Sequence, residues 1–466
     1  MRLVALGGSD AGISAALRAR ELDPAVEATV VVADAFPNFS ICGIPYYVSG
    51  DVGDWRELAH RTVDDLEAAG IELRLGTTVA EIDPRGHRIM AEGGETIDYD
   101  ALVIGTGSVP MSPPIDGLDR LGPAEGVHLL HSIGDTFELM RTLDGPLVRR
   151  AVIVGAGYIG LELAEALVTR GLEVTQIEQL PEVLPTVDPD LGALIREELA
   201  RNGVDVRCGT RVESVAAAPE EVDGRLMVRA SGPAGDSSSF PADLVLVAVG
   251  VRPEVEVAAS AGVELGVKGA IAVDRRMRTN IPGVFAAGDC AVTHHRLLGT
   301  TYLPLGTTAH KQGRVAGENA VGGTRDFAGI LGTQVVKVFD LVAARTGLRD
   351  HEATAAGLEP ETVSVSADDH KAYYPGARTV EMRLTGDLRD GRLLGVQMVG
   401  GRTSEIAMRI DIPATAIFNE MNADQLSDLD LSYTPPFGSP WDPVQAGTQE
   451  LTRQIEGSRR SHPMAH

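Results

Sequence analysis

Cysteine is scarce in this chain of 466 residues, which holds three cysteines, at positions 42, 208 and 290. Three cysteines are too few for a disulfide scaffold, and their number is odd. We therefore expect a protein that works in the reducing cytoplasm.

Positive charge and long apolar runs are also scarce. The 41 Lys and Arg residues stand against 66 Asp and Glu residues, which gives a net charge of −25. Such a chain repels polyanions, so we expect neither nucleic acid nor a membrane surface as a partner. No apolar run approaches the roughly 20 residues that a membrane span requires. The first six residues are too short an apolar stretch for the core of a signal peptide.

The length predicts about three domains at roughly 150 residues each. Residues 3–32 and 151–178 both follow the order strand, glycine turn, helix, strand, which is typical of a dinucleotide-binding unit. Asp100–Ile104 and Asp243–Val249 are apolar runs bounded by glycine that suit buried strands, and we expect mostly parallel sheets.

The character of the sequence changes near residue 326. Strands are predicted at Thr333–Ala344, Thr379–Leu384 and Leu393–Val399, with a helix near Thr403–Phe418. This indicates a separate α+β domain. The last residues, from about 452, lack apolar periodicity and predict a loose tail.

The second glycine loop has the full fingerprint for a nucleotide pyrophosphate. Gly155, Gly157 and Gly160 open a helix whose free N–H groups suit a phosphate. Glu178 follows the next strand, where an acid accepts the ribose hydroxyls and repels a 2′-phosphate. The loop therefore predicts NADH in preference to NADPH.

The first glycine loop is less regular. Gly7 and Gly12 fit the outer positions, whereas Ser9 replaces the middle glycine. Asp34 is our candidate for the ribose acid, although it comes two positions later than a strand ending at Val32 predicts. Alone, this loop is weak evidence for a nucleotide site, and the second loop strengthens it.

Two further motifs carry a family resemblance. Tyr99–Pro110 and Asn280–Ala291 resemble the two FAD signatures of the two-dinucleotide-binding flavoprotein disulfide reductases, and Val245–Pro253 is similar to the strand that leaves their NADH domain. The resemblance covers residues 1 to about 450. It implies that Thr106 and Gly107 close over FAD and that Asp289 binds the ribityl chain. Leu303–Ala309 then looks like the helix start that faces the flavin, where the helix dipole stabilises negative charge.

The resemblance implies an α/β fold with two Rossmann-like domains, one for FAD and one for NADH, and a C-terminal α+β domain that makes a homodimer. The expected boundaries are 1–118 and 251–325 for FAD, 119–250 for NADH, 326–452 for dimerisation and 453–466 for the tail. The residues expected to bind FAD are Gly7, Ser9, Ala11, Gly12, Asp34, Val79, Thr106, Gly107, Gly288, Asp289, Leu305 and Thr307. Those expected to bind NADH are Gly155, Gly157, Tyr158, Ile159, Gly160, Glu178 and Gly250.

Cys42 is the candidate redox residue. It lies in the segment Asn38–Gly50, which has no second cysteine and resembles the coenzyme A disulfide reductase branch of the family rather than the two-cysteine reductases. This implies a mixed disulfide between Cys42 and a small-molecule substrate. A cysteine at a helix start beside an oxidised flavin is expected to have a lowered pKa.

Two tyrosine segments of the last domain complete the expected site. Lys371–Gly376 and Ser432–Phe437 look like the segments through which a partner subunit lends tyrosines to the cysteine in coenzyme A disulfide reductases. A phenol is a plausible proton donor to a leaving thiolate. Tyr433 is the first candidate and Tyr373 the second, with packing at an interface as the alternative for both.

Other activities stay open. NADH peroxidases and water-forming NADH oxidases of the family carry a histidine where this chain has Asp10, which argues against peroxide chemistry unless Asp10 relays protons. In such enzymes Cys42 would cycle through sulfenic acid. A persulfide reductase and a flavoprotein redox sensor without turnover are further alternatives.

The remaining cysteines and histidines predict no second site. Cys208 ends an expected strand and is expected to be structural, and Cys290 follows Asp289 and is expected to pack near FAD. The histidines at 294, 295 and 310 have no metal-ligand spacing, and no metal is predicted.

Overall fold

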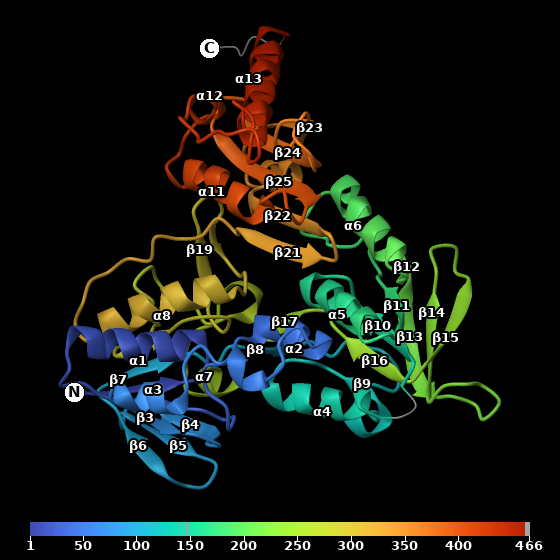
Figure 1. Ribbon diagram of the computed structural model, residues 1–466. Helices are drawn as coiled ribbons and strands as arrows, with labels where there is room; N and C mark the ends of the chain where they lie inside the picture. The colour runs from blue at the N-terminus through green and yellow to red at the C-terminus, as the bar shows by residue number, and fades with distance from the viewer. Residues whose placement is uncertain (146–147, 462–466) are drawn as a thin grey trace. The chain divides into compact units, whose positions relative to one another are not determined.

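The computed structural model describes residues 1–145 and 148–461, which divide into two compact units. The first unit comprises residues 1–113, 129–144 and 249–330, and the second comprises 114–128, 145–248 and 331–466. Each unit contains one five-stranded parallel sheet (Figure 1). The α/β fold with two Rossmann-like units is therefore confirmed.

The parallel sheet of the first unit has the strand order β18-β7-β1-β2-β3. Its strands are β18 (Val284–Ala286), β7 (Ala101–Ile104), β1 (Arg2–Leu6), β2 (Glu27–Val31) and β3 (Ile71–Arg74). Leu3 lies beside Ala28 and Ala101, and the apolar residues of these strands are buried on both faces. Burial on both faces explains the unbroken apolar runs in the sequence.

Helices and smaller strands complete the first unit. The helices are α1 (Asp10–Leu22), α2 (Ile44–Ser49), α3 (Val63–Ala68), α4 (Ile133–Leu143), α7 (Glu256–Ser260) and α8 (Gly306–Ala320), with short 3-10 turns η1 (Ile41–Gly43), η2 (Trp55–Leu58) and η4 (Val267–Gly269). Antiparallel pieces are β4 (Val79–Asp83), β5 (Arg88–Ala91) and β6 (Thr96–Asp98), the pair β8 (Ser108–Pro110) and β17 (Val251–Pro253), and the pair β19 (Thr293–His295) and β20 (Gly299–Thr301).

Helices α1 and α8 pack with their backbones in close approach. A Cβ atom at Gly313 would lie 2.3 Å from the carbonyl oxygen of Ala11, and one at Gly317 would lie 2.1 Å from that of Ala15. Any side chain at these two positions would hold the helices apart. The two glycines therefore fix which residues of α1 and α8 lie side by side.

The parallel sheet of the second unit has the order β12-β11-β10-β16-β9. Its strands are β12 (Asp205–Arg207), β11 (Glu173–Ile177), β10 (Arg150–Val154), β16 (Leu244–Val247) and β9 (Val127–His128). Helices α5 (Tyr158–Thr169) and α6 (Pro189–Arg201), the turn η3 (Pro123–Glu125) and an antiparallel sheet of β13 (Arg211–Ala217), β14 (Leu226–Ser231) and β15 (Ser237–Ala242) accompany it.

The C-terminal part of the second unit combines a sheet with helices, which agrees with the expected α+β domain, and its strands pair antiparallel. Its strand order is β21-β22-β25-β24-β23, formed by β21 (Gln334–Val338), β22 (Leu341–Gly347), β23 (Pro360–Asp368), β24 (Thr379–Asp387) and β25 (Leu393–Gly401). The helices are α9 (Asp350–Ala355), α10 (Ile406–Arg409), α11 (Asp411–Phe418), α12 (Ala423–Ser427) and α13 (Pro443–Ser461). The expectation of mostly parallel sheets is therefore wrong outside the two Rossmann-like sheets.

The expectation of a loose tail from residue 453 is also wrong as far as Ser461. Residues 443–461 form helix α13, which buries Leu451 and Ile455. A Cβ atom at Gly386 would lie 3.0 Å from Ile455, so the sheet approaches this helix closely. One apolar residue per helical turn was too sparse a pattern to reveal the helix. Residues 462–466 lie outside the described residues, and the other expected boundaries stay predictions.

Candidate active site

The first glycine loop joins β1 to α1 with the backbone shape of a pyrophosphate site. Gly7 has a φ of 108°, and a Cβ atom there would lie 2.0 Å from the carbonyl oxygen of Gly105. A Cβ atom at Gly12 would lie 2.1 Å from the carbonyl oxygen of Gly7, so glycine lets the helix start against the strand end. Ser9 is the N-cap of α1, and its side chain makes no capping hydrogen bond. Its hydroxyl therefore does not compete with a phosphate for the first-turn N–H groups.

Other predicted flavin residues follow neighbouring parallel strands. Thr106 and Gly107 come after β7, and Gly288 and Asp289 come after β18. Since β18, β7 and β1 are parallel neighbours, their carboxyl ends share one edge of the sheet with Gly7. The structure thus brings together the two FAD signatures and the first glycine loop.

The remaining predicted flavin residues lie around the same strands and helices. Ala11 is buried in α1, and a Cβ atom at Gly288 would lie 2.8 Å from its methyl group. Leu305 is the N-cap of α8, and Thr307 lies in the first turn of that helix. The others are Asp34, which follows β2 by three residues, and Val79, the first residue of β4.

Asp289 is an acid with one buried carboxylate oxygen that can accept a further hydrogen bond. Its Oδ1 atom is buried and makes no hydrogen bond with any described residue. Burial, and then the charge of Asp10, raises the pKa of Asp289 to about 6, although hydrogen bonds from the Leu305 N–H and the Ser108 hydroxyl oppose the shift. A polyol hydroxyl such as those of a ribityl chain would satisfy this oxygen. Together with the glycine cradle, this makes the residues present fit FAD.

Cys42 lies in the turn η1 and is exposed. The end of η2 holds the loop of Cys42, because the Ser40 N–H donates to the Leu58 carbonyl at 2.8 Å. On the same loop a Cβ atom at Gly43 would lie 2.6 Å from the end of the Leu58 side chain, so the glycine lets Leu58 pack closely against the loop. The exposed sulfur therefore stands on a supported turn rather than on a long loop.

Asn38 is a residue of this loop that the sequence did not single out. It has a φ of 58° and is buried, and its N–H donates to the carbonyl oxygen of Gly8 at 2.6 Å. Its own carbonyl oxygen accepts from the N–H of His60 at 2.9 Å. Asn38 thus connects the cysteine loop to the first glycine loop and to His60. Asparagine tolerates the left-handed conformation, which is the only sequence signal for this role.

An aromatic cluster supports the same loop. Trp55 of η2 packs edge-on against Phe36 and Phe137, with ring centroids 5.0 Å apart in both pairs, and Phe39 lies 5.4 Å from Trp55. In a chain with 4% aromatic residues, this is a local concentration of rings. Edge-to-face pairs stabilise such a cluster beyond the burial of area alone.

The other two cysteines are chemically different from Cys42. Cys208 is half-buried 3.8 Å from a Glu182 oxygen, and burial followed by the Glu182 charge raises its pKa to about 11. Cys290 is fully buried with its sulfur 3.4 Å from the carbonyl oxygens of Ile104 and Ala287, and burial raises the pKa of its thiol. Neither environment favours a reactive thiolate.

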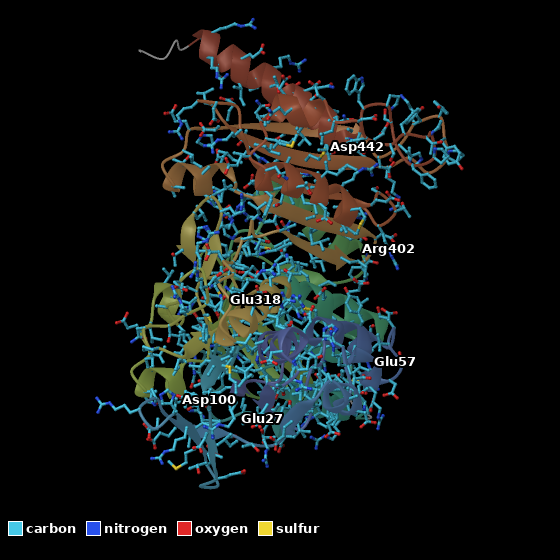
Figure 2. All side chains as sticks on the ribbon, turned by 90° about the vertical axis from the view of Figure 1, so that its left-hand side faces the viewer. Glu27, Glu57, Asp100, Glu318, Arg402 and Asp442 are labelled. Carbon is cyan, nitrogen blue, oxygen red and sulfur yellow. The ribbon has the colours of Figure 1, made fainter. Side chains whose placement is uncertain are left out.

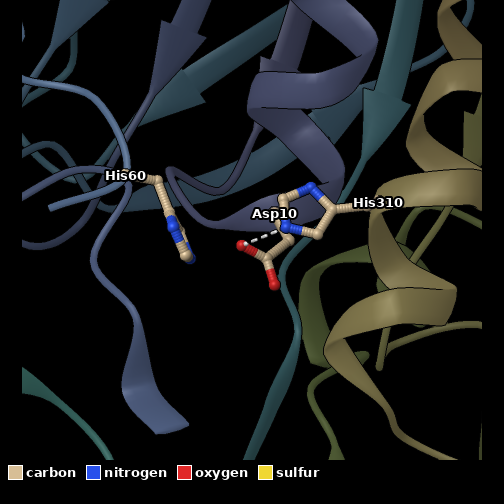
Figure 3. A group of neighbouring side chains, drawn as sticks. All are labelled: Asp10, His60 and His310. Carbon is tan, nitrogen blue, oxygen red and sulfur yellow. Dashed lines mark ion pairs between the residues drawn. The ribbon is translucent and has the colours of Figure 1, made fainter. Parts of the chain in front are cut away.

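Asp10, His60 and His310 form a polar group that sequence spacing did not reveal (Figure 3). His310 Nε2 lies 3.3 Å from Asp10 Oδ1, and the His60 and His310 rings have centroids 5.9 Å apart. Burial raises the pKa of Asp10, while the charges of His310 and His60 oppose that shift. Spacing along the chain thus did not reveal the neighbours of His310 in space, and the expectation of no metal stays a prediction.

The second glycine loop, in the second unit, has the same shape as the first. Gly155 has a φ of 103°, and a Cβ atom at Gly160 would lie 2.3 Å from the Gly155 carbonyl oxygen. Gly157, the N-cap of α5, has open space around the position of a Cβ atom. These three positions match the tight turn, the close helix packing and the room for a pyrophosphate that the fingerprint requires.

Glu178 follows β11 and is 6% exposed. Its two carboxylate oxygens accept from the N–H groups of Ala156 and Leu180, each at 2.8 Å. These bonds fix the carboxylate beside the glycine loop. A fixed negative charge there suits ribose hydroxyls and repels a 2′-phosphate.

The other residues predicted to bind NADH differ in burial, and they do not all belong to the second unit. Tyr158 is held by hydrogen bonds with Gln334 and Thr186, and burial raises the pKa of its phenol. Ile159 is exposed on the first turn of α5. Gly250 belongs to the first unit, where its carbonyl oxygen accepts from the Met111 N–H.

Tyr373 and Tyr433 lie together in the second unit. Their hydroxyls share a hydrogen bond, which raises the pKa of Tyr373. Tyr373 is 73% exposed and Tyr433 is 44% exposed, so both phenols face outward from this protomer.

Arg409 joins the two tyrosine segments. It is buried and donates to the Asp369 carbonyl at 2.6 Å, to the Phe437 carbonyl at 3.3 Å and to the Asp442 carboxylate at 3.1 Å. Asp442, labelled in Figure 2, directly precedes α13. One guanidinium thus fixes the loop that carries Tyr373 relative to the loop that carries Tyr433. No local pattern in the sequence predicts this role.

Comparison with known sequences gives matches along most of the chain. The model of the pyridine nucleotide-disulphide oxidoreductase family matches residues 1–313, and that of its dimerisation domain matches residues 333–442. An NADH oxidase of Methanocaldococcus jannaschii is 31% identical and covers 98% of this chain and 99% of its own. An NAD(P)H sulfur oxidoreductase (CoA-dependent) of Pyrococcus furiosus is 35% identical over 95% of this chain and 97% of its own. A coenzyme A disulfide reductase of Staphylococcus haemolyticus is 28% identical over the same shares.

A solved structure agrees with these matches. That of an NAD-dependent persulfide reductase from A. fulgidus has a TM-score of 0.90 and 37% identity, and covers 98% of this chain and 84% of that chain. No helix in the described parts of this protein is long and apolar enough to cross a membrane. The two nucleotide loops, the supported cysteine and the dimerisation domain agree with these matches: the chain belongs to the pyridine nucleotide-disulphide oxidoreductase family and is an oxidoreductase whose cofactors are FAD and NADH.

Proposed function

We propose that this protein uses NADH to reduce a low-molecular-weight disulfide of the coenzyme A type through Cys42. The observation that carries the proposal is the single exposed cysteine on a supported turn, while Cys208 is half-buried with a raised pKa and Cys290 is buried. The coenzyme A chemistry in the names of two relatives supports the choice of substrate. The scarcity of cysteine supports a reducing, cytoplasmic setting.

The chemistry at Cys42 is thiol–disulfide exchange. The Cys42 thiolate attacks one sulfur of the substrate, so that the substrate S–S bond breaks, a mixed disulfide forms and one thiol leaves after taking up a proton. When bound, FAD and NADH would supply the two electrons for cleavage of the mixed disulfide. The second substrate thiolate would then leave and take up a proton, and Cys42 would be a thiolate again.

The remaining predicted residues hold the cofactors. Gly7, Gly12 and Asp289 would bind FAD at the edge formed by β1, β7 and β18. Gly157 and Glu178 would bind NADH, and the fixed Glu178 carboxylate disfavours NADPH.

We assign proton donation to the tyrosine pair across a homodimer. The dimerisation domain supports a dimer, and the exposed phenols of Tyr373 and Tyr433 are available to a second protomer. The hydrogen bond between the two hydroxyls raises the pKa of Tyr373, so Tyr373 stays protonated while it contacts Tyr433. Tyr433 would donate directly, and Tyr373 would orient it through their shared hydrogen bond.

The test is an anaerobic titration with NADH, with flavin spectra recorded before and after coenzyme A disulfide is added. We expect NADH to bleach the flavin and the disulfide to restore its colour in the wild type and in Cys208→Ser. In Cys42→Ser the disulfide should leave the flavin reduced. Reoxidation of Cys42→Ser at the wild-type rate would contradict the proposal.

A second candidate is reduction of oxygen, peroxide or a persulfide, because similar proteins are named NADH oxidase and persulfide reductase. The same titration separates these activities. If coenzyme A disulfide has no effect, while air or a persulfide restores the flavin colour, the second candidate replaces the first.

A further inference from the structure

Three side chains from separate segments of the first unit present metal-binding atoms to one another. Asp10 begins α1, His310 lies on α8, and His60 follows η2. Their ligand atoms all lie within 4.8 Å of one another. In Figure 3 the Asp10 carboxylate lies between the two imidazole rings.

The fold holds each member of this group in place. The close approach of α1 and α8 at Gly313 and Gly317 sets His310 beside the first turn of α1. The backbone of His60 is fixed by its hydrogen bond to the Asn38 carbonyl oxygen at 2.9 Å. The fold therefore brings the three side chains close together before a metal ion binds. This lowers the conformational entropy that binding would cost.

The second nitrogen of His310 has a partner of the kind that metal-binding histidines use. His310 Nδ1 lies 3.0 Å from the hydroxyl oxygen of Ser14, which accepts its proton in one of the two tautomers. In that tautomer the lone pair on Nε2 faces Asp10 Oδ1 at 3.3 Å, and Oδ1 is buried without a hydrogen bond. In the other tautomer Nε2 carries the proton and donates it to Oδ1, so this pair of atoms can hold either a proton or a metal ion between them.

The spacing fits a transition-metal ion. Zn–N bonds of about 2.05 Å and Zn–O bonds of about 2.1 Å at a tetrahedral angle separate the two ligand atoms by roughly 3.4 Å. The 3.3 Å between Nε2 and Oδ1 agrees with this value.

We propose that Asp10, His60 and His310 bind a divalent transition-metal ion, with Zn²⁺ as the reference cation. Two imidazoles and one carboxylate leave coordination positions open, as in zinc sites that keep a water or exogenous ligand. Through His60 and Asn38 the ion would be joined by backbone to the loop of Cys42. Cys42 is not among the three ligands, so zinc binding and disulfide reduction can be tested by separate measurements.

The experiment measures Zn²⁺ binding to the flavin-loaded Cys42→Ser protein, in which the exposed thiol no longer competes for zinc. After treatment with a chelator, binding is followed at pH 7.5 by competition with a chromophoric chelator. We expect the His60→Ala/His310→Ala double variant of this protein to bind one zinc ion fewer per chain. Replacing His351, an exposed histidine of α9, by alanine is the matched control and should change nothing.

Two further variants keep the test decisive. Ser14→Ala should lower zinc affinity about 10-fold to 100-fold, as loss of a partner to a ligating histidine does. Asp10→Asn preserves side-chain size and serves if the double variant loses its flavin.

The opposite results overturn the proposal. If Cys42→Ser binds no more zinc than the double variant, or than Asp10→Asn with its flavin retained, the group is an ordinary ion pair. Since zinc binding is measured without turnover, the disulfide reductase can fail its own test while this site passes, and the reverse.

Discussion

The two glycine loops reach the same backbone shape from different residues. In the second loop Gly157 stands at the centre, and Glu178 is buried with both oxygens bonded to backbone N–H groups. In the first loop Ser9 is central, and half-buried Asp34 accepts one N–H at 3.3 Å. In both loops the close backbone contacts require glycine at the outer positions. The acid that follows is held by two hydrogen bonds in the second loop and by one long hydrogen bond in the first.

The largest effect is expected from replacing the last glycine of each loop, where both loops bring a helix start against a backbone carbonyl oxygen. Gly12→Ala and Gly160→Ala each place a methyl group within about 2.3 Å of a carbonyl oxygen, as the 2.1 Å and 2.3 Å separations show. We expect each to cost about 3 kcal/mol of unfolding free energy, the upper range for overpacking. Gly12→Ala should release FAD, while Gly160→Ala should stay yellow and lose NADH affinity. Denaturant titration, flavin absorbance and NADH binding measure these effects, and normal binding in either variant would contradict the steric argument.

The next largest effect is expected from replacing the acid that follows each loop, Glu178 or Asp34. Glu178→Ala leaves two N–H groups without their acceptor, which should cost about 2 kcal/mol of unfolding free energy. Asp34→Ala loses one long hydrogen bond and should cost less than about 1 kcal/mol. Glu178→Ala should also reduce the preference for NADH over NADPH. Glu173→Ala, on the exposed start of β11, is the control. If both substitutions lowered the free energy of unfolding equally, the claim that Glu178 is held more tightly than Asp34 would be wrong.

The last prediction concerns the pH dependence of stability. A partly buried acid in the first unit has a raised pKa, whereas one in the second unit has a lowered pKa. Burial raises the pKa of Asp289 to about 6, above its usual 3.8, so its contribution to stability is full below about pH 4 and lost as pH rises through 6. Glu352 behaves oppositely: burial raises its pKa, but hydrogen bonding and charge from Arg345, with Arg349, lower it to about 2. Its contribution is present above about pH 4.5 and lost as pH falls through 2.

Asp289→Asn should therefore remove a fall in stability of the flavin-free protein on the order of 1 to 2 kcal/mol between pH 4 and 7. Glu352→Gln should instead weaken the protein at neutral pH and flatten its acid unfolding. Denaturant titrations across pH measure both. An unchanged pH profile in Asp289→Asn would show that another group carries the dependence.

Local patterns made much of the fold and part of the site predictable. Gly155, Gly160 and Glu178 act within one strand-helix-strand unit, so their spacing along the chain already describes their geometry. The Asp10 group escaped prediction, because 296 residues separate Ser14 from His310 and only the glycines of α8 bring the helices together. Arg409 escaped for a similar reason, since its partners belong to two distant loops. Helix α13 was missed because its buried face is narrow.

The aromatic cluster around Trp55 has a consequence for observing this molecule. The chain has two tryptophans: Trp55 packs among phenylalanines in the first unit, and Trp441 is exposed in the second. Their emission maxima should differ, with blue-shifted light from Trp55. Fluorescence at two wavelengths would then follow the opening of each unit separately, with no added label.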